Sequence, residues 1–294
     1  MTPALTPVRA TGPDGPWRRE TGSALDRLGH AVVWGRLDDW DGAGTPQAVL
    51  STGEMRRAAS LSGRRRAAFV ASRLLLRHAA AHALAAAPAE IDVARAPGGR
   101  PYLRGFDGLD VSVSHTGDLV AVALSRAGRI GVDVEPAART VRRLDEGVFT
   151  PYESAASARW AGARRARALI RLWTLKEAYG KALGLGLRLP FGSFGFTAAD
   201  TDADGPARLV LPDGTPADPA GWRFLNRTLT PAPAGAHILG LALRYEPPAG
   251  LDSTLGAVVL STPRPGAVRG TGPRTASPGA AAASGRTARS RVRR

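Results

Sequence analysis

The sequence predicts an α+β protein, because stretches with helical and with strand periodicity follow one another through its central part. A helix-like stretch comes first, three short strand-like stretches follow it, and a second helical region and further strands end the series. The chain has 294 residues, of which 44% are hydrophobic, enough for one large core or two modest ones. We expect the folded part to span residues 27–247.

The first predicted helix covers residues 67–84. Its large apolar side chains recur at helical spacing, from Phe69 and Val70 to the run that begins at Leu74. Pro88 follows shortly afterwards and marks the end of the helical pattern. The stretch therefore predicts a mostly buried helix.

Three strands are predicted next. Residues 110–115 alternate between apolar and polar side chains, and residues 119–124 are apolar throughout. The turn residues between them indicate a β-hairpin. After a second turn, residues 130–135 read as a third strand that Pro136 ends, so we expect a three-stranded meander.

Helices return after this meander. Thr150 can cap a helix, Pro151 suits its first position, and Glu153 completes a capping box. Residues 166–183 form the second long predicted helix, which Gly184 ends.

Short strand-like segments then close the folded part, at residues 193–197, 208–211, 222–225 and 237–245. Residues 1–26 and 248–294 are rich in small residues, proline and charge, with little apolar periodicity. Such segments bury too little apolar surface to offset the entropy of ordering, so we expect both to be disordered.

The formal net charge of +15 suggests an anionic partner. Eight arginines against one aspartate lie in residues 248–294. This leaves open a nucleic-acid-binding or scaffold protein that acts through its tail, although no aromatic-basic interleaving or helix-turn-helix pattern supports it.

The chain has no cysteine, so disulfides and thiolate metal sites are excluded. The N-terminus does not contain the apolar core of a signal sequence, and no stretch approaches the roughly 18 apolar residues of a membrane span, so we expect a cytoplasmic protein without membrane contact. The only lysines are Lys176 and Lys181, which suggests that these two positions need an ammonium group.

Two carboxylates mark the third predicted strand. Asp133 and Glu135 are two residues apart, so both point to one face of the strand. Mg²⁺ prefers oxygen ligands of this kind and completes its shell with water and phosphate oxygens. The alternative is that the two acids form only the solvated face of an amphipathic strand.

The second long helix carries another charged face. Trp173, Glu177 and Lys181 lie four residues apart, so their side chains share one side of the helix. An acid and an ammonium there could hold a metal ion and a phosphate, or they could form an ordinary surface ion pair. Gly180 inside the helix favours a close packing contact, since glycine destabilises a helix interior.

Together these segments resemble the paired signature of the 4'-phosphopantetheinyl transferase superfamily, and in particular its large, surfactin-synthetase-activating type. The two main blocks are residues 131–135, GVDVE, and 173–181, WTLKEAYGK. Smaller blocks in the same order are GRP at 99–101 (Gly99-Arg100-Pro101), VSHTG at 113–117, FTPYE at 149–153 and GLGL at 184–187. The resemblance covers about residues 55–197.

The resemblance implies a fold of two similar α+β subdomains related by a pseudo-twofold axis, here residues 27–128 and 129–247. It implies an enzyme that moves the 4'-phosphopantetheine arm of coenzyme A to a serine of an apo acyl or peptidyl carrier protein, leaving 3',5'-ADP. Such carriers serve fatty-acid, polyketide and nonribosomal-peptide synthesis. The resemblance also implies a monomer that does not bind nucleic acid; a catalytically degraded family member is the other alternative.

The resemblance further implies roles for single residues. Asp133, Glu135 and Glu177 would bind Mg²⁺ at the pyrophosphate of coenzyme A. Glu153 would take the proton of the carrier serine, with a purely structural capping box as the alternative, and Lys181 would stabilise charge on the phosphate. The remaining residues that would contact coenzyme A are Arg64, Arg73, Arg100, Ser114, His115 and Lys176.

Three positions depart from the family pattern. Arg100 stands where many relatives have lysine, Thr116 where serine is common, and Gly180 where a larger apolar residue is usual. Because arginine can bind two phosphate oxygens at once, the change at Arg100 is compatible with a phosphate contact.

Overall fold

The α+β class expected from the sequence is confirmed. A computed structural model of the chain describes residues 5–40, 46–139, 147–200, 203–217, 220–230 and 235–245. The basic segment 248–294 lies outside these ranges. Among the described residues, no helix is long and apolar enough to cross a membrane.

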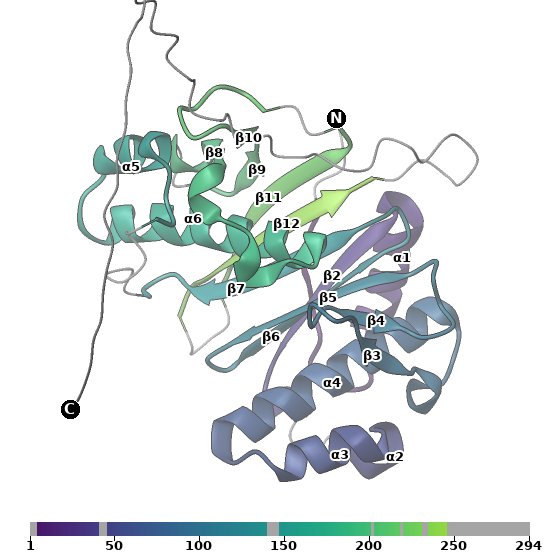
Figure 1. Cartoon of the computed structure of the whole chain (residues 1–294). Helices are drawn as coiled ribbons and strands as arrows, with labels where there is room; N and C mark the ends of the chain where they lie inside the picture. The colour runs from purple at the N-terminus through teal and green to yellow at the C-terminus, as the bar shows by residue number, and fades with distance from the viewer. Residues whose placement is uncertain are drawn as a thin grey trace, which may run out of the picture. The chain divides into compact units, whose positions relative to one another are not determined.

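The N-terminal half contains a four-stranded sheet in the order β1-β2-β6-β5. β1 and β2 are parallel, and the other neighbours are antiparallel. The helices α1 and α4 pack on this sheet (Figure 1). The bounds in this half are β1 Val8–Arg9, α1 Trp17–Leu28, β2 His30–Arg36, α2 Pro46–Val49, α3 Thr52–Ala59, α4 Gly63–Leu84, β3 Val93–Arg95, β4 Pro101–Leu103, β5 Asp110–Thr116 and β6 Leu119–Ser125.

The C-terminal half contains a second antiparallel sheet in the order β7-β12-β11-β9. The long helix α6 packs on it, and β8 pairs with β10 beside it. The bounds in this half are β7 Ile130–Pro136, α5 Pro151–Ala158, α6 Gly162–Leu183, β8 Gly195–Phe196, β9 Gly205–Ala207, β10 Leu209–Val210, β11 Trp222–Leu229 and β12 His237–Arg244. Short 3₁₀ helices are Asp38–Trp40, Pro88–Glu90, Gly186–Arg188, Phe191–Ser193 and Thr197–Asp200.

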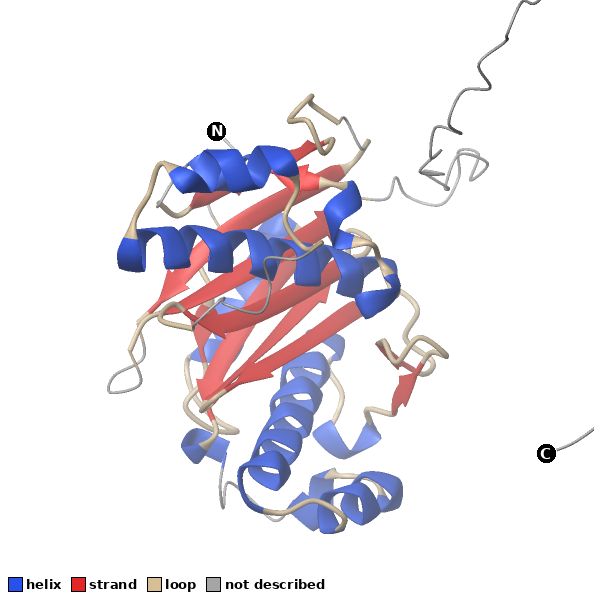
Figure 2. Ribbon diagram, turned by 60° about the vertical axis from the view of Figure 1, so that its left-hand side comes forward, coloured by secondary structure: helices blue, strands red, loops and turns tan. Residues whose placement is uncertain are grey.

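The two sheets lie between the helices, so the strands at the centre are buried on both faces (Figure 2). In β6, Val120 and Val122 pack towards α1 and α4, whereas Leu119 and Ala121 pack towards the second sheet. A third core lies between α6 and the second sheet. Burial on both faces explains why residues 119–124 are apolar without alternation.

The two halves repeat one motif at identical spacing. Ser51 and Glu54 form a capping box at the start of α3, and Thr150 and Glu153 form one at the start of α5. In each half a helix of 22 residues follows and carries a buried cation, Arg77 or Lys176, which pairs with the glutamate of that box. This repetition supports the pseudo-twofold relation that the family resemblance implied.

The predicted three-stranded meander is wrong in its last step. β5 and β6 form the expected hairpin, but β7 pairs with β12 in the other sheet. The reason is that β2 already pairs with the second edge of β6. β2 was not predicted as a strand.

β7 nevertheless lies beside β5, and side chains join them. The backbone N–H groups of Ile130, Val132 and Val134 donate to the side-chain oxygens of Asp110, Ser112 and Ser114, at 2.7, 3.1 and 3.4 Å. Residues two apart on β5 face the same way, so one strand can supply all three acceptors. This side-chain ladder satisfies the outer edge of β7 without direct strand pairing.

The predicted disorder of residues 1–26 is wrong for the part that the structure describes. Residues 8–9 add a strand to the first sheet, and α1 begins at Trp17. Trp17, Thr21 and Leu25 are buried, and their spacing of four forms one helical stripe. The prolines and glycines around this stripe hid the signal.

The long helices themselves agree with the predictions, although both begin four residues earlier than expected. Gly184 caps α6 in the left-handed conformation, as predicted. Gly180 also meets the expectation of a close contact, since a Cβ there would lie 3.2 Å from the carbonyl oxygen of Gly186.

Gly131 allows a much closer approach between β7 and α6. A Cβ at this position would lie 1.9 Å from the carbonyl oxygen of Ala178. We therefore expect Gly131→Ala to destabilise the protein by about 2–3 kcal/mol, since the strand and helix must separate. Denaturant unfolding measures this, with Gly108→Ala as the matched control because nothing lies within 4 Å of its added methyl group. Equal stability of the two variants would contradict the close approach.

Candidate active site

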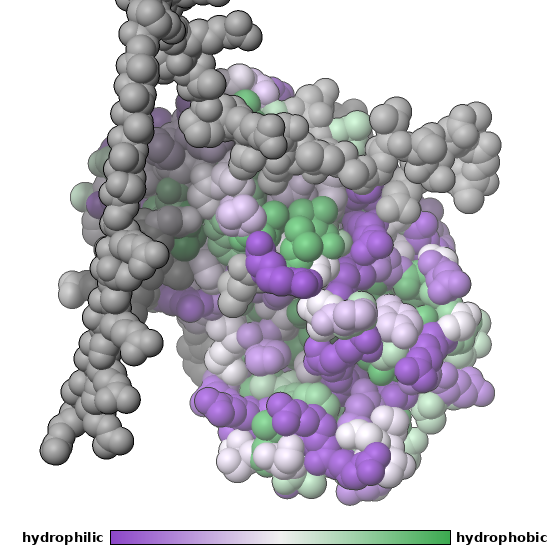
Figure 3. All heavy atoms as spheres, viewed as in Figure 1, coloured by the Kyte–Doolittle hydropathy of each residue, from purple (hydrophilic) through white to green (hydrophobic). Residues whose placement is uncertain are grey.

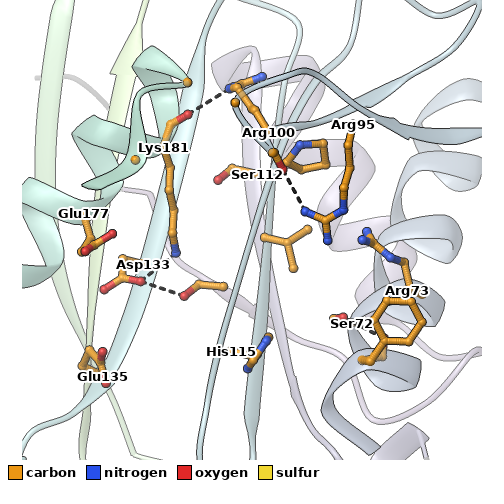
Figure 4. Close-up of a pocket in the computed structure, with 18 of the residues that line it drawn as sticks. Ser72, Arg73, Arg95, Arg100, Ser112, His115, Asp133, Glu135, Glu177 and Lys181 are labelled. Carbon is orange, nitrogen blue, oxygen red and sulfur yellow. Dashed lines mark hydrogen bonds and ion pairs between the residues drawn. The ribbon is translucent and has the colours of Figure 1, made fainter. Parts of the chain in front are cut away.

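A cavity of about 1060 Å³ lies where the two halves meet, lined by α4, β5, β7, α6 and the loop before β4 (Figure 4). Its lining is divided by charge. Carboxylates of β7 and α6 form one side, and arginines of the N-terminal half form the other. The cavity can therefore hold a cation and an extended polyanion at the same time.

The acidic side consists of Asp133, Glu135 and Glu177, which all line the cavity. Ile130, Val132 and Val134 on the opposite face of β7 fill the core between the sheets. The alternation of β7 thus directs both acids towards the end of α6, where Glu177 lies. The alternative of a merely solvated face does not describe Asp133, which is only 5% exposed.

Asp133 has one engaged oxygen and one without a partner. Its Oδ1 accepts hydrogen bonds from Ser114 Oγ at 2.8 Å and from Lys181 Nζ at 2.7 Å. Its buried Oδ2 has no hydrogen-bond partner among the described residues. A buried carboxylate oxygen in this state is costly, and a bound cation would relieve the cost.

The surroundings of Glu177 raise the pKa of this acid. Burial raises the pKa of Glu177 to about 7, and the negative charges of Asp133 and Glu135 act in the same direction against Lys181. Carboxylates that repel one another in this way can all stay ionised if a divalent cation binds between them.

These features fit a divalent cation, although the ligand set is not assembled. Among the described residues, no group of three or more acids and histidines lies at metal-binding spacing. Glu135 accepts a hydrogen bond from Thr116 Oγ1 at 3.0 Å and pairs with Arg139. A shift of the Glu135 or Glu177 side chain would therefore be part of cation binding.

The basic side is formed by Arg57, Arg65, Arg73 and Arg95. Burial lowers the pKa of Arg73 to about 10, and the like charges of Arg95 and Arg77 contribute. Arg73 stays protonated at neutral pH and pairs with Glu54 at 3.5 Å, while the cations Arg95 and Arg77 also lie near it. An anion in the cavity would be stabilised there.

His115 and Lys181 lie between the two sides (Figure 4). Partial burial lowers the pKa of His115, with a contribution from the charge of Lys181. The neutral imidazole can still donate one hydrogen bond to a phosphate oxygen. Lys181 Nζ bonds the carbonyl oxygen of Val132 at 3.1 Å as well as Asp133, which leaves one N–H of the ammonium group for a ligand.

The predicted contact of Arg64 with coenzyme A is not supported by the structure. Arg64 lies outside the cavity lining and pairs with Asp118. Arg64 and Arg73 are nine residues apart, which places them on opposite faces of one helix. Arg65 faces the cavity instead, together with Phe69 and Arg73 at four-residue spacing, so the helical pattern could have identified it.

Exposed arginines also extend this basic surface outwards. Arg56, Arg57 and the run 64–66 at the start of α4 are exposed. Much of the surface over α3 and α4 is hydrophilic in Figure 3. Arg57 and Arg95 were missed in the sequence because neither lies on a predicted element.

Glu153 and Lys176 require the largest correction. Both are 0% exposed and lie outside the cavity lining. Glu153 accepts hydrogen bonds from the N–H groups of Thr150 and Phe196, both at 2.9 Å, and pairs with Lys176 at 2.9 Å. The structure thus supports the capping-box alternative in place of the predicted base.

Lys176 is the buried ion-pair partner of Glu153. Its Nζ also donates to the carbonyl oxygens of Phe191 and Phe194. An ammonium has three N–H donors, and three acceptors surround it here. These three acceptors explain why the position has lysine in an arginine-rich chain. The predicted contact of Lys176 with coenzyme A is not supported, because the side chain is buried outside the cavity.

Comparison with known proteins connects this site to a family. The family model described as "4'-phosphopantetheinyl transferase superfamily" matches residues 129–234. A second model, for the N-terminal part of 4'-phosphopantetheinyl transferases, matches residues 53–127. The two matched regions correspond to the two halves that form the cavity.

Curated relatives carry the same description. A putative 4'-phosphopantetheinyl transferase of Synechocystis is 30% identical over 189 residues, which are 62% of this chain and 74% of that protein. The chain belongs to the 4'-phosphopantetheinyl transferase superfamily, as the sequence motifs predicted.

Other relatives are matched over a smaller share of their length. The 4'-phosphopantetheinyl transferase of Bacillus subtilis is 30% identical over 48% of this chain and 61% of its own length. A phosphopantetheinyl transferase of Thraustochytrium is 31% identical over 49% of this chain and 54% of its own length. The chain thus spans between about half and three quarters of these three relatives.

Proposed function

We propose that this protein transfers the 4'-phosphopantetheine group of coenzyme A to a serine of an apo acyl or peptidyl carrier protein, with Mg²⁺ as the cofactor. The observation that supports this most strongly is the charge division of one cavity into a carboxylate side and an arginine side. Coenzyme A has a pyrophosphate for the first side and a separate 3'-phosphate for the second. Family membership gives the reaction class.

Asp133, Glu135 and Glu177 would hold the cation, which would neutralise charge that develops on the pyrophosphate. The ammonium of Lys181, which is bonded to Asp133, would stabilise the same negative charge. Arg57, Arg65, Arg73 and Arg95 would bind the 3'-phosphate, and His115 would donate to a phosphate oxygen near them. These residues bind and orient the donor.

The proton of the carrier serine requires an acceptor inside the cavity. Glu153 does not line it, whereas Glu177 does and has a pKa raised to about 7. This pKa belongs to the cation-free protein and a bound cation would lower it, so the position of Glu177 in the cavity carries the assignment. We therefore assign this role to Glu177, in addition to its contact with the cation.

Arg65 and Arg64 provide a matched test of the basic side. Arg65 lines the cavity, and its neighbour Arg64 pairs with Asp118 outside it. We expect Arg65→Ala to weaken coenzyme A binding about tenfold and Arg64→Ala to leave it within about twofold, because, of these two side chains, only that of Arg65 faces the phosphate. Titration calorimetry measures both. A larger loss for Arg64→Ala would refute the assignment of the cavity face.

The transfer itself is tested by mass spectrometry of apo carrier proteins after incubation with the protein, coenzyme A and Mg²⁺. The proposal predicts that a carrier gains the mass of phosphopantetheine and that EDTA prevents it. If fatty-acid, polyketide and peptide carriers all stay unmodified while coenzyme A binds, the proposed reaction is wrong. A monomer in the cytoplasm remains the expectation from the sequence.

A further inference from the structure

Arg100 lines the cavity but its guanidinium is bound to the protein. It donates to both oxygens of Asp110, at 2.6 and 2.5 Å, to the carbonyl oxygen of Lys181 at 2.9 Å and to that of Ile130 at 2.8 Å. Its side chain is only 9% exposed. We call the pair of Arg100 and Asp110 the clasp.

The clasp joins the two halves of the protein. Arg100 and Asp110 belong to the N-terminal half, and their partners Ile130 and Lys181 belong to β7 and α6. Asp110 Oδ2 also accepts the N–H of Ile130 at 2.7 Å, so the clasp bonds both backbone groups of this residue. It thereby replaces a neighbouring strand at the start of β7.

The surrounding backbone fits this contact closely. The loop that carries Arg100 packs against the end of α6, where a Cβ at Gly98 would lie 2.4 Å from the carbonyl oxygen of Gly184. The loop is closed by a hydrogen bond from the N–H of Ala96 to the carbonyl oxygen of Arg100, at 2.9 Å. Arg100 is therefore held from both its backbone and its side chain.

The partners of the clasp lead directly to the acidic side of the cavity. Lys181, whose carbonyl oxygen bonds Arg100, places its ammonium on Asp133 Oδ1 and Val132 O. β7, whose first residue is bonded by the clasp, carries Asp133 three residues further on. In Figure 4 the guanidinium of Arg100 lies towards the Lys181 backbone, away from Arg73.

We propose that Arg100, with Asp110, is a positioning residue of the transfer reaction: it acts through Lys181 and β7 and is not a phosphate ligand of coenzyme A. This inference rests on the proposed function. The charge of Arg100 is already neutralised by two short hydrogen bonds to one carboxylate, whereas Arg57 and Arg65 are exposed in the same cavity. A phosphate would have to displace Asp110 and two backbone acceptors to bind this guanidinium.

The test separates turnover from coenzyme A binding. Arg100→Lys removes the bidentate contact but keeps the charge. We expect kcat to fall about tenfold or more, because small shifts of a reacting group are costly, while the Kd of coenzyme A stays within about twofold. Asp110→Asn is expected to show the same split. The double variant should lose no more than the more affected single variant, since the two side chains act as one unit.

Arg104→Lys is the matched control, because Arg104 forms a solvent-exposed pair with Asp92 at 3.5 Å. It should leave both quantities unchanged. All variants are compared well below their unfolding temperatures, so that a fold defect does not lower kcat.

A rise of about tenfold in the Kd of coenzyme A for Arg100→Lys would overturn the inference, because a lost phosphate contact predicts it. An unchanged kcat in both single variants would also overturn it. Failure of the proposed function looks different: the wild-type protein would then bind coenzyme A but modify no carrier, and no variant would be needed to see it.

Discussion

Replacing Glu177 by glutamine is expected to lower the turnover of the transfer reaction about 10³-fold, because the variant loses both the proton acceptor and a ligand of the cation. Glutamine has almost the same shape, so the lining of the cavity changes little. Coenzyme A binding in the absence of Mg²⁺ should therefore be retained. Carrier modification followed by mass spectrometry, beside calorimetry of coenzyme A, checks both expectations.

The same variant should alter how stability depends on pH. Burial and the charges of Asp133 and Glu135 raise the pKa of Glu177 to about 7. A raised acid pKa contributes stability below the unfolded value, and this contribution is lost as the pH rises through about 7. Metal-free wild-type protein should therefore lose stability between pH 5 and about pH 8 relative to Glu177→Gln.

Thermal unfolding of both proteins in EDTA at these two pH values measures the difference. Addition of Mg²⁺ should reduce it for the wild-type protein at the higher pH, since the cation compensates the ionised carboxylates. A stability difference that is the same at both pH values would show that Glu177 does not lie in a crowded acidic site.

The second large effect is expected at Lys176. Lys176→Met would leave the fully buried Glu153 without its counter-charge and two backbone carbonyl groups without their donor. Removal of one partner of a buried ion pair costs about 3–5 kcal/mol. We expect a loss of this size in denaturant unfolding.

Glu153→Gln separates this structural role from the predicted catalytic one. The double variant Lys176→Met/Glu153→Gln should be more stable than Lys176→Met alone, because no unpaired charge stays buried. The single variant Glu153→Gln, measured while folded, should keep its turnover within about tenfold, since a lost general base would cost more. A loss above about 100-fold in a stable protein would restore Glu153 as the base.

The sequence predicted those parts of the site whose geometry depends on a single strand or a single helix. Asp133 and Glu135 follow from strand alternation, and Glu177 and Lys181 from helical spacing. Both pairs line the cavity, as does Ser114 on β5. The family motifs added the superfamily, which the comparisons bear out.

The remaining errors concern contacts between distant segments. The motif around Glu153 fits a capping box equally well, and only its burial beside Lys176 decides between the two roles. Arg100 was assigned by motif alone, and Asp110, Ile130 and Lys181 show what it binds here. Likewise β7 carries strand periodicity, but its partner β12 lies about a hundred residues later, and periodicity does not identify partners.

The most direct test of the divided cavity is a crystal structure of the protein with coenzyme A and Mn²⁺, measured for the anomalous signal of the metal. The account predicts an anomalous peak beside Asp133 and Glu177 and the 3'-phosphate of coenzyme A among Arg57, Arg65 and Arg73. A metal peak away from these carboxylates, or a 3'-phosphate bound to Arg100 in place of Asp110, would contradict it.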